Sequence, residues 1–193
     1  MRCTGWVTVE TATRERLLSC AEELFAQSPF DAVSVRAICA AAHANVAAVH
    51  YHFGTKEDLV VALLDERLVP RWRDALDGLT AASPVPDVVD AILTPFIEIQ
   101  SDALGRTHLH LLARLIADAP HARRPKGWTS LRRWSATLPN VDEKSARARW
   151  ALAFDLILTS FGRTGATPLS PDAIAALRDF VIAGLTAPPT PAP

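Results

Sequence analysis

The sequence lacks the long hydrophobic runs of membrane proteins. A membrane-spanning helix needs about 18 or more consecutive apolar residues, and no stretch of this 193-residue chain provides them. Residues 1–6 contain no apolar core of the kind found in secretory signal peptides. From these two absences we expect a cytoplasmic protein that has no membrane partner.

Cysteines and catalytic motifs are also scarce. Cys3, Cys20 and Cys39 are an odd number with no paired spacing, so we expect reduced thiols, with Cys3 as the one candidate for a redox-sensing thiol. No glycine-rich phosphate loop, His-Glu-x-x-His or Gly-x-Ser-x-Gly motif is present. His108 and His110 are two residues apart, and on a helix such side chains diverge too far to hold one ion. We expect no enzyme, no metal site and no cofactor.

An excess of charge of either sign is missing as well. The chain has 20 Lys and Arg residues against 21 Asp and Glu residues. A nucleic-acid-binding protein of this composition has to rely on a few well-placed donors and on dimerisation rather than on a basic surface. Hydrophobic residues, by contrast, make up 49% of the chain, and strand-type alternation is rare. This composition predicts an all-α fold of about nine helices.

Signals for helix boundaries cluster between Ser34 and Lys56. Ser34 and Asn45 are good N-cap residues, and each precedes a short apolar stretch. Gly54 suits the left-handed position that ends a helix, and Thr55 with Asp58 forms a variant capping box for the next helix. These signals predict two short helices joined by a tight turn. A helix-turn-helix unit of this kind places its second helix in the major groove of DNA.

The second of these short helices has an inward and an outward side. Val49 and Phe53 are four residues apart and fall on the inward side. The outward side and its flank carry Val46, Ala47, His50 and Tyr51. Because Ala47 and Ala48 are small, the helix axis can come close to the base edges.

Two segments in the N-terminal third follow the pattern of a known family. Residues 14–26 (Arg-Glu-Arg-Leu-Leu-Ser-Cys-Ala-Glu-Glu-Leu-Phe-Ala) and residues 51–57 (Tyr-His-Phe-Gly-Thr-Lys-Glu) resemble the first helix and the signature of TetR-family transcriptional regulators. The resemblance covers about residues 13–64. It implies an N-terminal three-helix DNA-binding domain followed by a helical ligand-binding and dimerisation domain. Residues 45–53 are similar to a branch of the family in which some members respond to fatty acids or their coenzyme A esters.

One position departs from the family pattern. His43 and Ala44 stand where family members usually carry Gly-Val. The glycine is needed there because the turn between the two helices requires a positive φ. A histidine at that position costs about 1 kcal/mol.

The resemblance also implies a set of DNA-contacting residues. Phosphate contacts are implied for Ser34, Tyr51, His52, Thr55 and Lys56. Arg36 lies sixteen residues before His52, the offset of a base-contacting arginine in some members, and an arginine fork fits guanine O6 and N7. Its alternative roles are a phosphate contact or a solvated helix position. The full predicted DNA-binding set is Ser34, Arg36, Asn45, Val46, Ala47, Ala48, His50, Tyr51, His52, Thr55 and Lys56.

The chain is expected to divide into two domains and a tail. We expect a DNA-binding domain over 1–55, with 1–10 as a mobile arm and a first helix over 13–26, a ligand-binding and dimerisation domain over 56–186, and a disordered tail over 187–193. The helix that starts after Thr55 should run towards Leu79 with a kink or break at Pro70. Further helices are predicted over 87–102 (interrupted near Thr94), 106–118, 129–137, from 142, and over 171–185.

The last two predicted helices, over 143–162 and 171–185, are apolar on two sides, which is typical of helices buried on two sides. They predict a homodimer held by a four-helix bundle to which each protomer contributes a pair. The expected interface residues are Trp150, Phe154, Ile157, Phe161, Leu177 and Val181. The alternative is an ordinary monomer core.

An effector site is predicted in the helices between residues 87 and 138. Many apolar and few polar side chains occur there, a composition typical of an apolar pocket with a polar anchor, although a packed core explains the same residues. The expected ligand-binding residues are Phe96, His108, Leu112, Arg114, Trp128 and Trp134.

Together, the pattern and the resemblance predict a ligand-responsive DNA-binding transcriptional regulator. We expect a homodimeric repressor that binds double-stranded palindromic operator DNA and is released by a small apolar effector, such as a fatty acid or an acyl-coenzyme A. The alternative is an all-α ligand-binding protein or enzyme in which the helix-turn-helix is incidental.

Overall fold

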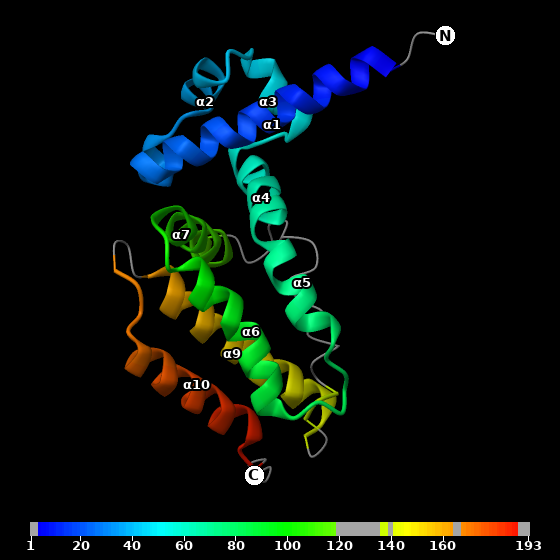
Figure 1. Ribbon diagram of the computed structural model, residues 1–193, viewed down its shortest axis with the longest axis vertical. Helices are drawn as coiled ribbons and strands as arrows, with labels where there is room; N and C mark the ends of the chain where they lie inside the picture. Colours follow the sequence, from blue (N-terminus) through cyan, green and yellow to red (C-terminus); the bar gives the residue numbers. More distant parts are fainter. Residues whose placement is uncertain (1–3, 119–135, 139–140, 164–166, 189–193) are drawn as a thin grey trace. The chain divides into compact units, whose positions relative to one another are not determined.

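The computed structural model describes residues 4–118, 136–138, 141–163 and 167–188, which fall into two compact units (Figure 1). All regular structure in these ranges is helical, with nine α-helices and one short 3-10 helix, which confirms the predicted all-α fold. Among the described residues, the first unit ends at Arg67 and the second begins at Leu68.

The first unit is built around one long helix. It consists of α1 (Thr4–Gln27), the 3-10 helix η1 (Phe30–Ala32), α2 (Val35–Ala41), α3 (Val46–His52) and α4 (Lys56–Arg67). α1 packs against α2, α3 and α4 (Figure 1). The inward side chains of α1 are buried, namely Leu17, Leu18, Ala21 and Phe25, and the ring of Phe25 stacks on that of Phe30 with 5.7 Å between centroids. α1 is therefore the common support of the other three α-helices.

Two boundaries of this unit differ from the prediction. α1 begins at Thr4, so the mobile arm predicted over 1–10 is wrong from residue 4 onward, whereas residues 1–3 lie outside the described ranges. No proline occurs in residues 4–27, so nothing interrupts the helical hydrogen bonds of α1. The unit also extends to Arg67, beyond the division predicted at residue 55, because α4 packs on α1.

Side chains cap the starts of α2, α3 and α4. Ser34 Oγ accepts a hydrogen bond from the main-chain N–H three residues later at 3.1 Å, and Asn45 Oδ1 accepts one from the N–H two residues later at 3.0 Å. Thr55 Oγ1 accepts a hydrogen bond from the N–H of Asp58 at 3.0 Å and donates to Asp58 Oδ2 at 2.9 Å. The three helix starts predicted from these residues are confirmed.

His43 occupies a left-handed position in the turn between α2 and α3. Its φ is 49°, and it is the one non-glycine residue with a positive φ in the described part of the chain. The N–H of His43 donates to the carbonyl of Ala40 at 3.2 Å, and the N–H of Ala44 donates to the carbonyl of Cys39 at 2.9 Å. These are the two hydrogen bonds of a Schellman motif. The turn therefore keeps the conformation that glycine favours, although the residue is a histidine.

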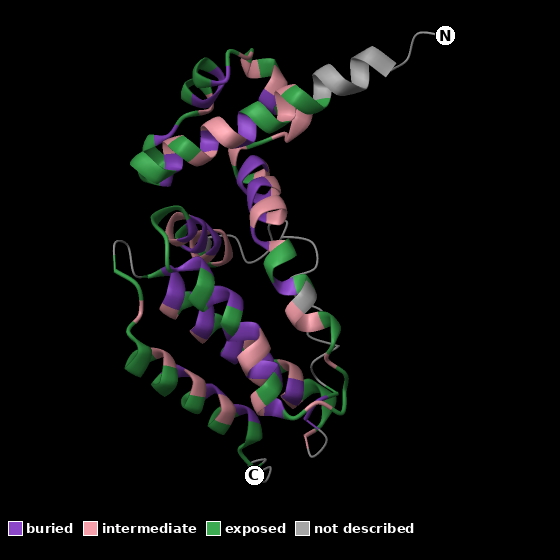
Figure 2. Ribbon diagram, in the orientation of Figure 1, coloured by how far each residue is buried: buried purple, intermediate pink, exposed green. Residues whose placement is uncertain are grey.

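The second unit contains the longer helices of the C-terminal part. It consists of α5 (Val69–Asp77), α6 (Val85–Ile99), α7 (Ala103–Asp118), α9 (Glu143–Gly162) and α10 (Pro171–Thr186). α6 packs on α5, α7 and α10, and α9 packs on α7 and α10. Buried side chains line α6 and α9, whereas α10 is exposed along one side (Figure 2). α7 and α9 approach each other closely at Gly162, where an added Cβ would lie 2.2 Å from the Cβ of Ala113.

Two prolines have different effects on the helices that contain them. Pro70 is the second residue of α5, and the helix predicted from Thr55 to Leu79 is broken there into α4 and α5, as expected. Pro95 lies inside α6, which stays continuous, so the interruption predicted near Thr94 is wrong. The indole N–H of Trp72 donates to the carbonyl of Ile92 at 2.9 Å. This bond ties α5 to α6 one residue beyond the Ala91 carbonyl that Pro95 leaves without its helical donor, and burial of Ile92, Leu93 and Phe96 stabilises the helix around the proline. The helix predicted over 129–137 lies almost wholly outside the described ranges.

Polar side chains attach α10 to α6. Arg178 on α10 forms a two-pronged ion pair with Asp90 on α6, with 2.7 Å between Nη2 and Oδ2. The hydrogen bond from Arg178 lowers the pKa of Asp90 below its ordinary value. Where α6 ends and α10 begins, the side chain of Gln100 accepts a hydrogen bond from the N–H of Leu169 at 2.8 Å. These contacts fix the position of α10 on the second unit.

We expect His43→Gly to stabilise the protein. Glycine adopts a positive φ without the strain of a β-carbon, so the free energy of unfolding should rise by about 1 kcal/mol. Ala40→Gly is the matched control, because Ala40 is exposed inside α2 and glycine there should cost about 1 kcal/mol. Urea unfolding measures both changes. Equal destabilisation by the two substitutions would show that His43 is not strained.

Candidate nucleic-acid interface

α3 presents one side to solvent and packs the other on the first unit. Val49 is fully buried, and Phe53 at the end of the helix is half-buried. The exposed residues are Asn45, Ala47, His50 and Tyr51, and Val46, Ala48 and His52 are half-buried beside them. Tyr51 is 75% exposed, the most exposed of the large hydrophobic side chains in the described residues. The predicted base-facing residues therefore lie together on the solvent side of α3.

Aromatic contacts orient the C-terminal end of α3. The rings of Tyr51 and His52 meet edge to face with 5.1 Å between centroids. The guanidinium of Arg14, from α1, lies 5.4 Å from the centroid of the Phe53 ring. Phe53 and Arg14 thus anchor this end of α3 on α1, while the Tyr51 ring extends into solvent.

One hydrogen bond fixes the tautomer of His50. Its Nδ1 lies 2.8 Å from the carbonyl oxygen of Gly54. A carbonyl oxygen only accepts hydrogen bonds, so Nδ1 carries the proton. In the neutral ring, Nε2 is then a hydrogen-bond acceptor, and the side chain is exposed. Such an acceptor suits the amino groups of adenine or cytosine in the major groove.

The polar residues at the helix starts differ in what they still offer to a ligand. The Thr55 hydroxyl both donates and accepts within its cap with Asp58. Ser34 Oγ and Asn45 Oδ1 accept hydrogen bonds in their caps, which leaves the Ser34 O–H and the Asn45 amide N–H groups as donors. Arg36, in the first turn of α2, is exposed. Ser34, Asn45 and Arg36 thus present donors to solvent, whereas Thr55 does not.

The half-buried Lys56 binds carbonyls of its own unit, which its place in the sequence signature did not reveal. Its Nζ donates to the carbonyl of Phe30 at 3.0 Å and to that of Val33 at 2.9 Å. The same nitrogen lies 3.9 Å from the centroid of the Phe30 ring. The partners are 26 and 23 residues away in sequence, so no local pattern points to them.

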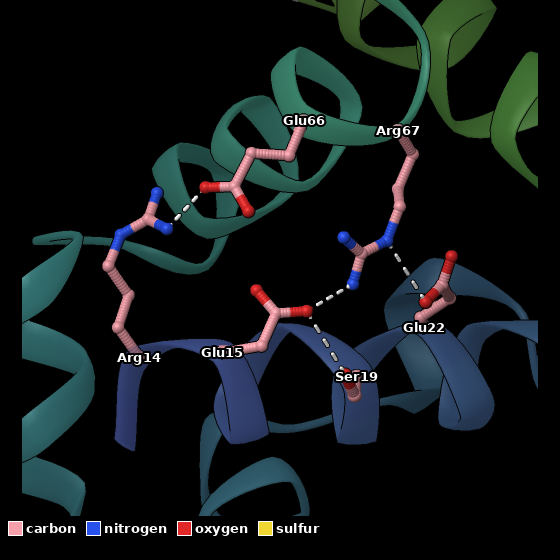
Figure 3. Close-up of polar contacts among 6 residues, drawn as sticks. All are labelled: Arg14, Glu15, Ser19, Glu22, Glu66 and Arg67. Carbon is pink, nitrogen blue, oxygen red and sulfur yellow. Dashed lines mark hydrogen bonds and ion pairs between the residues drawn. The ribbon is translucent and has the colours of Figure 1, made fainter. Parts of the chain in front are cut away.

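Ion pairs between α1 and the end of α4 are a second feature that sequence reasoning missed (Figure 3). Arg67 contacts Glu15 at 2.6 Å and Glu22 at 3.4 Å, and Arg14 pairs with Glu66. The hydrogen bond from Arg67 lowers the pKa of Glu15 below its ordinary value. These pairs lie at the surface and are partly exposed, and pairs of this kind contribute of the order of 1 kcal/mol or less each. These pairs fix the end of α4 on α1. Arg67 and Glu15 are 52 positions apart, so no local sequence pattern indicates the pair.

The cysteine thiols of the first unit are buried to different degrees. Cys39 is buried, Cys20 is half-buried, and both are free. Burial raises the pKa of both thiols above the ordinary value. Neither is therefore the activated thiolate that a redox sensor needs. Cys3 lies outside the described ranges.

The predicted effector residues lie in the second unit, where most belong to packed helices. Phe96 stacks on Phe161 with 5.1 Å between ring centroids, and it meets Trp72 edge to face at 4.9 Å. His108 and Leu112 on α7 are buried, and Arg114 is half-buried. Trp128 and Trp134 lie outside the described ranges.

The six residues predicted to form the dimer interface are buried within the chain itself. Trp150, Phe154, Ile157, Phe161, Leu177 and Val181 are each at most 8% exposed in the single protomer. These side chains already pack against their own unit, so they are less accessible to a second chain than the exposed side of the two helices, and the interface set stays a prediction. The exposed apolar side chains of the same two helices are Leu152 on α9, 70% exposed, and Phe180 on α10, 69% exposed.

Two classes of site are absent from the described ranges. No group of His, Cys, Asp or Glu side chains there is arranged to hold a metal ion. No helix there has the length and apolar character that crossing a membrane requires.

Comparisons with known proteins agree with this geometry. Residues 17–63 match the family model described as bacterial regulatory proteins, tetR family. The HTH-type transcriptional regulator UidR of Escherichia coli K12 is 28% identical over 100 residues, which are 50% of this chain and 47% of that protein. UidR of Shigella flexneri matches to the same extent. The match therefore spans about half the length of these relatives.

A solved structure has the same fold over most of the chain. It is a TetR family transcriptional regulator from Pseudomonas syringae pv. tomato, with a TM-score of 0.55 and 17% identity. The alignment covers 89% of this chain and 94% of that one. Residues 17–63, which contain the helix-turn-helix unit of α2 and α3, are thus similar in sequence to the tetR family of bacterial regulatory proteins.

Proposed function

We propose that the protein is a dimeric transcriptional regulator that reads an operator with α3. The observation that carries this proposal is the solvent-facing side of α3, where Tyr51 is 75% exposed next to Ala47 and His50. A large aromatic side chain that extends into water from a short, well-capped helix has no role in the core of the unit. A tyrosine there can pack against a sugar and donate its O–H to a phosphate.

The arrangement of donors fits few but specific DNA contacts. Arg36 on α2 and the Asn45 amide remain available as donors to base edges or phosphates, and Nε2 of the neutral His50 ring can accept from a base amino group. Arg14 and Arg67 already pair with carboxylates of their own unit. Because few cations of the first unit are left for phosphates, affinity for DNA must come from the first units of two protomers that bind together. The UidR relatives carry the name of helix-turn-helix transcriptional regulators, which supports the same function.

The exposed side of α9 and α10 supports a second copy of this chain as the partner. Leu152 on α9 and Phe180 on α10 are large apolar side chains in water. Most of their exposed neighbours three or four residues away are small, namely Ala148, Ala176, Ala183 and Gly184, and one, Asp155, is charged. Small residues around two apolar anchors allow helices of two protomers to approach closely. A four-helix bundle made of two such pairs closes with two-fold symmetry.

For the effector we propose an elongated apolar molecule with an acidic end group, bound in the second unit. The support is the apolar content of α6 and α7 together with the half-buried cation Arg114. The resemblance of residues 45–53 to a branch with acyl-responsive members favours a fatty acid or an acyl-coenzyme A. The ligand must bind the DNA-free state more tightly, since equal affinity for both states shifts no equilibrium. Its binding would then release a repressor from the operator.

Operator binding tests the DNA-reading role. Selection from random DNA should recover a palindrome whose half-site centres lie about 34–36 Å apart. Tyr51→Ala should weaken binding to all sequences alike, whereas Arg36→Ala should lose about 1–3 kcal/mol of discrimination at one base pair. Gel-shift titrations on operator and scrambled DNA measure both effects. Equal losses on the two DNAs for Arg36→Ala would refute the base contact.

Dimerisation is tested by placing a charge on the exposed side of the last two helices. Leu152→Asp and Phe180→Asp should split the dimer, because an unpaired carboxylate buried in an interface costs of the order of several kcal/mol. Ile97→Asp, at an exposed apolar position on α6, is the control and should remain dimeric. Sedimentation velocity at micromolar concentration reports the state. A monomeric wild type would end the proposal.

The effector proposal is tested with acyl chains of graded length. A matching fatty acid should weaken operator binding by roughly 5–150-fold, the range of a coupling of about 1–3 kcal/mol. Arg114→Gln should weaken the response to the acid but not to the alcohol of the same chain length, since only the acid carries a charge. Operator titrations and tryptophan fluorescence follow the response. If no chain length changes either signal, the effector belongs to another chemical class.

A further inference from the structure

The ammonium of the half-buried Lys56 contacts acceptors of its own unit. Lys56 is the first residue of α4, and its ammonium reaches back to the segment around η1. It donates to the carbonyl oxygens of Phe30 at 3.0 Å and Val33 at 2.9 Å, and the Phe30 ring lies 3.9 Å away. An ammonium has three N–H donors and no acceptor. Two carbonyls and the face of an aromatic ring form an electron-rich environment for it.

The position of the two carbonyls matters for the helix-turn-helix. Val33 directly precedes Ser34, the N-cap of α2, so the bond to the Val33 carbonyl fixes the start of that helix relative to α4. The Phe30 carbonyl also accepts the N–H of Val33 at 3.2 Å, which closes the turn of η1. Lys56 thus connects the start of α4 to the segment that leads into α2.

We propose that Lys56 is a positioning residue that holds the start of α2 on α4, and that its ammonium makes no phosphate contact. This inference rests on the proposed DNA-binding function and revises one residue of the expected phosphate-contacting set. Two of the three N–H groups of Lys56 are already taken by these carbonyls, so moving the ammonium towards a phosphate would weaken two charge-assisted hydrogen bonds and the contact with the Phe30 ring. The remaining donors of the first unit, among them Arg36 and Tyr51, then make the DNA contacts.

Amine labelling of the intact wild-type protein tests the proposal. The chain contains three lysines, Lys56, Lys126 and Lys144, and the exposed Lys144 in α9 provides an internal standard. A brief pulse of acetic anhydride, read by peptide mass spectrometry, gives the acylation rate at each site. In the free protein, Lys56 should react about tenfold more slowly than Lys144, the ratio that about 1.4 kcal/mol of hydrogen bonding would produce. The rate at Lys56 should not change when operator DNA is added.

Either of two labelling results would overturn the proposal. Lys56 could react as fast as Lys144 in the free protein, or it could become protected only when DNA is bound. The measurement in free protein does not depend on DNA. If the wild type bound no operator, the proposed function would fail, while the rate at Lys56 relative to Lys144 would still decide whether its ammonium is held.

A salt titration provides an independent readout. Each phosphate contact contributes about 0.9 to the slope of log affinity against log salt concentration. Lys56→Met should lower both the unfolding midpoint and the operator affinity, the latter by the same factor at every salt concentration. Arg16→Gln removes the same charge from an exposed site on α1 and should lower neither. A slope that flattens by about 0.9 in Lys56→Met alone would refute the positioning role.

Discussion

Helices of seven residues cannot provide hydrogen-bond partners for all of their own main-chain N–H and carbonyl groups, and this constraint shapes the first unit. α2 and α3 are each seven residues long. The first four N–H groups and the last four carbonyls of a helix have no partner inside it, so in helices this short most main-chain groups need other partners. Isolated helices of this length are also unstable in water. The unit therefore exists only because caps, turns and α1 provide what the helices lack.

The polar side chains of the interface serve this need first. Ser34 and Asn45 cap the two helices, and His50 donates to the carbonyl of Gly54 just beyond α3. Lys56 binds two carbonyls around η1. In the proposed function, DNA would engage only the donors that remain after these bonds are made. A residue's presence in a family signature therefore does not tell whether it contacts the ligand or the protein's own main chain.

Sequence reasoning succeeded where the determining contacts are local. The starts of α2, α3 and α4 follow from caps whose partners lie two or three residues away. The Arg67 pairs with α1 and the bonds of Lys56 span 23 residues or more, so no periodicity indicates them. Both depend on how α4 packs, which the sequence does not display.

The last two helices show a different limit. Their pattern predicted burial on two sides, and the structure buries the larger of the two stripes inside the unit itself. Helical periodicity identifies apolar faces but does not say which face meets the protein's own core. Trp150 and Phe161 fill that core, which leaves Leu152 and Phe180 in water. In the sequence, the exposed side appears only as apolar residues, such as Leu152 and Phe180, that do not follow the main helical periodicity.

The central claim is that α3 enters the major groove, and methylation interference tests it most directly. Dimethyl sulfate modifies guanine at N7 in the major groove and adenine at N3 in the minor groove. The account predicts that guanine methylation blocks binding in two clusters about 10–10.5 base pairs apart, one for each head of a dimer. Interference confined to adenine N3, or none at either position, would contradict the account.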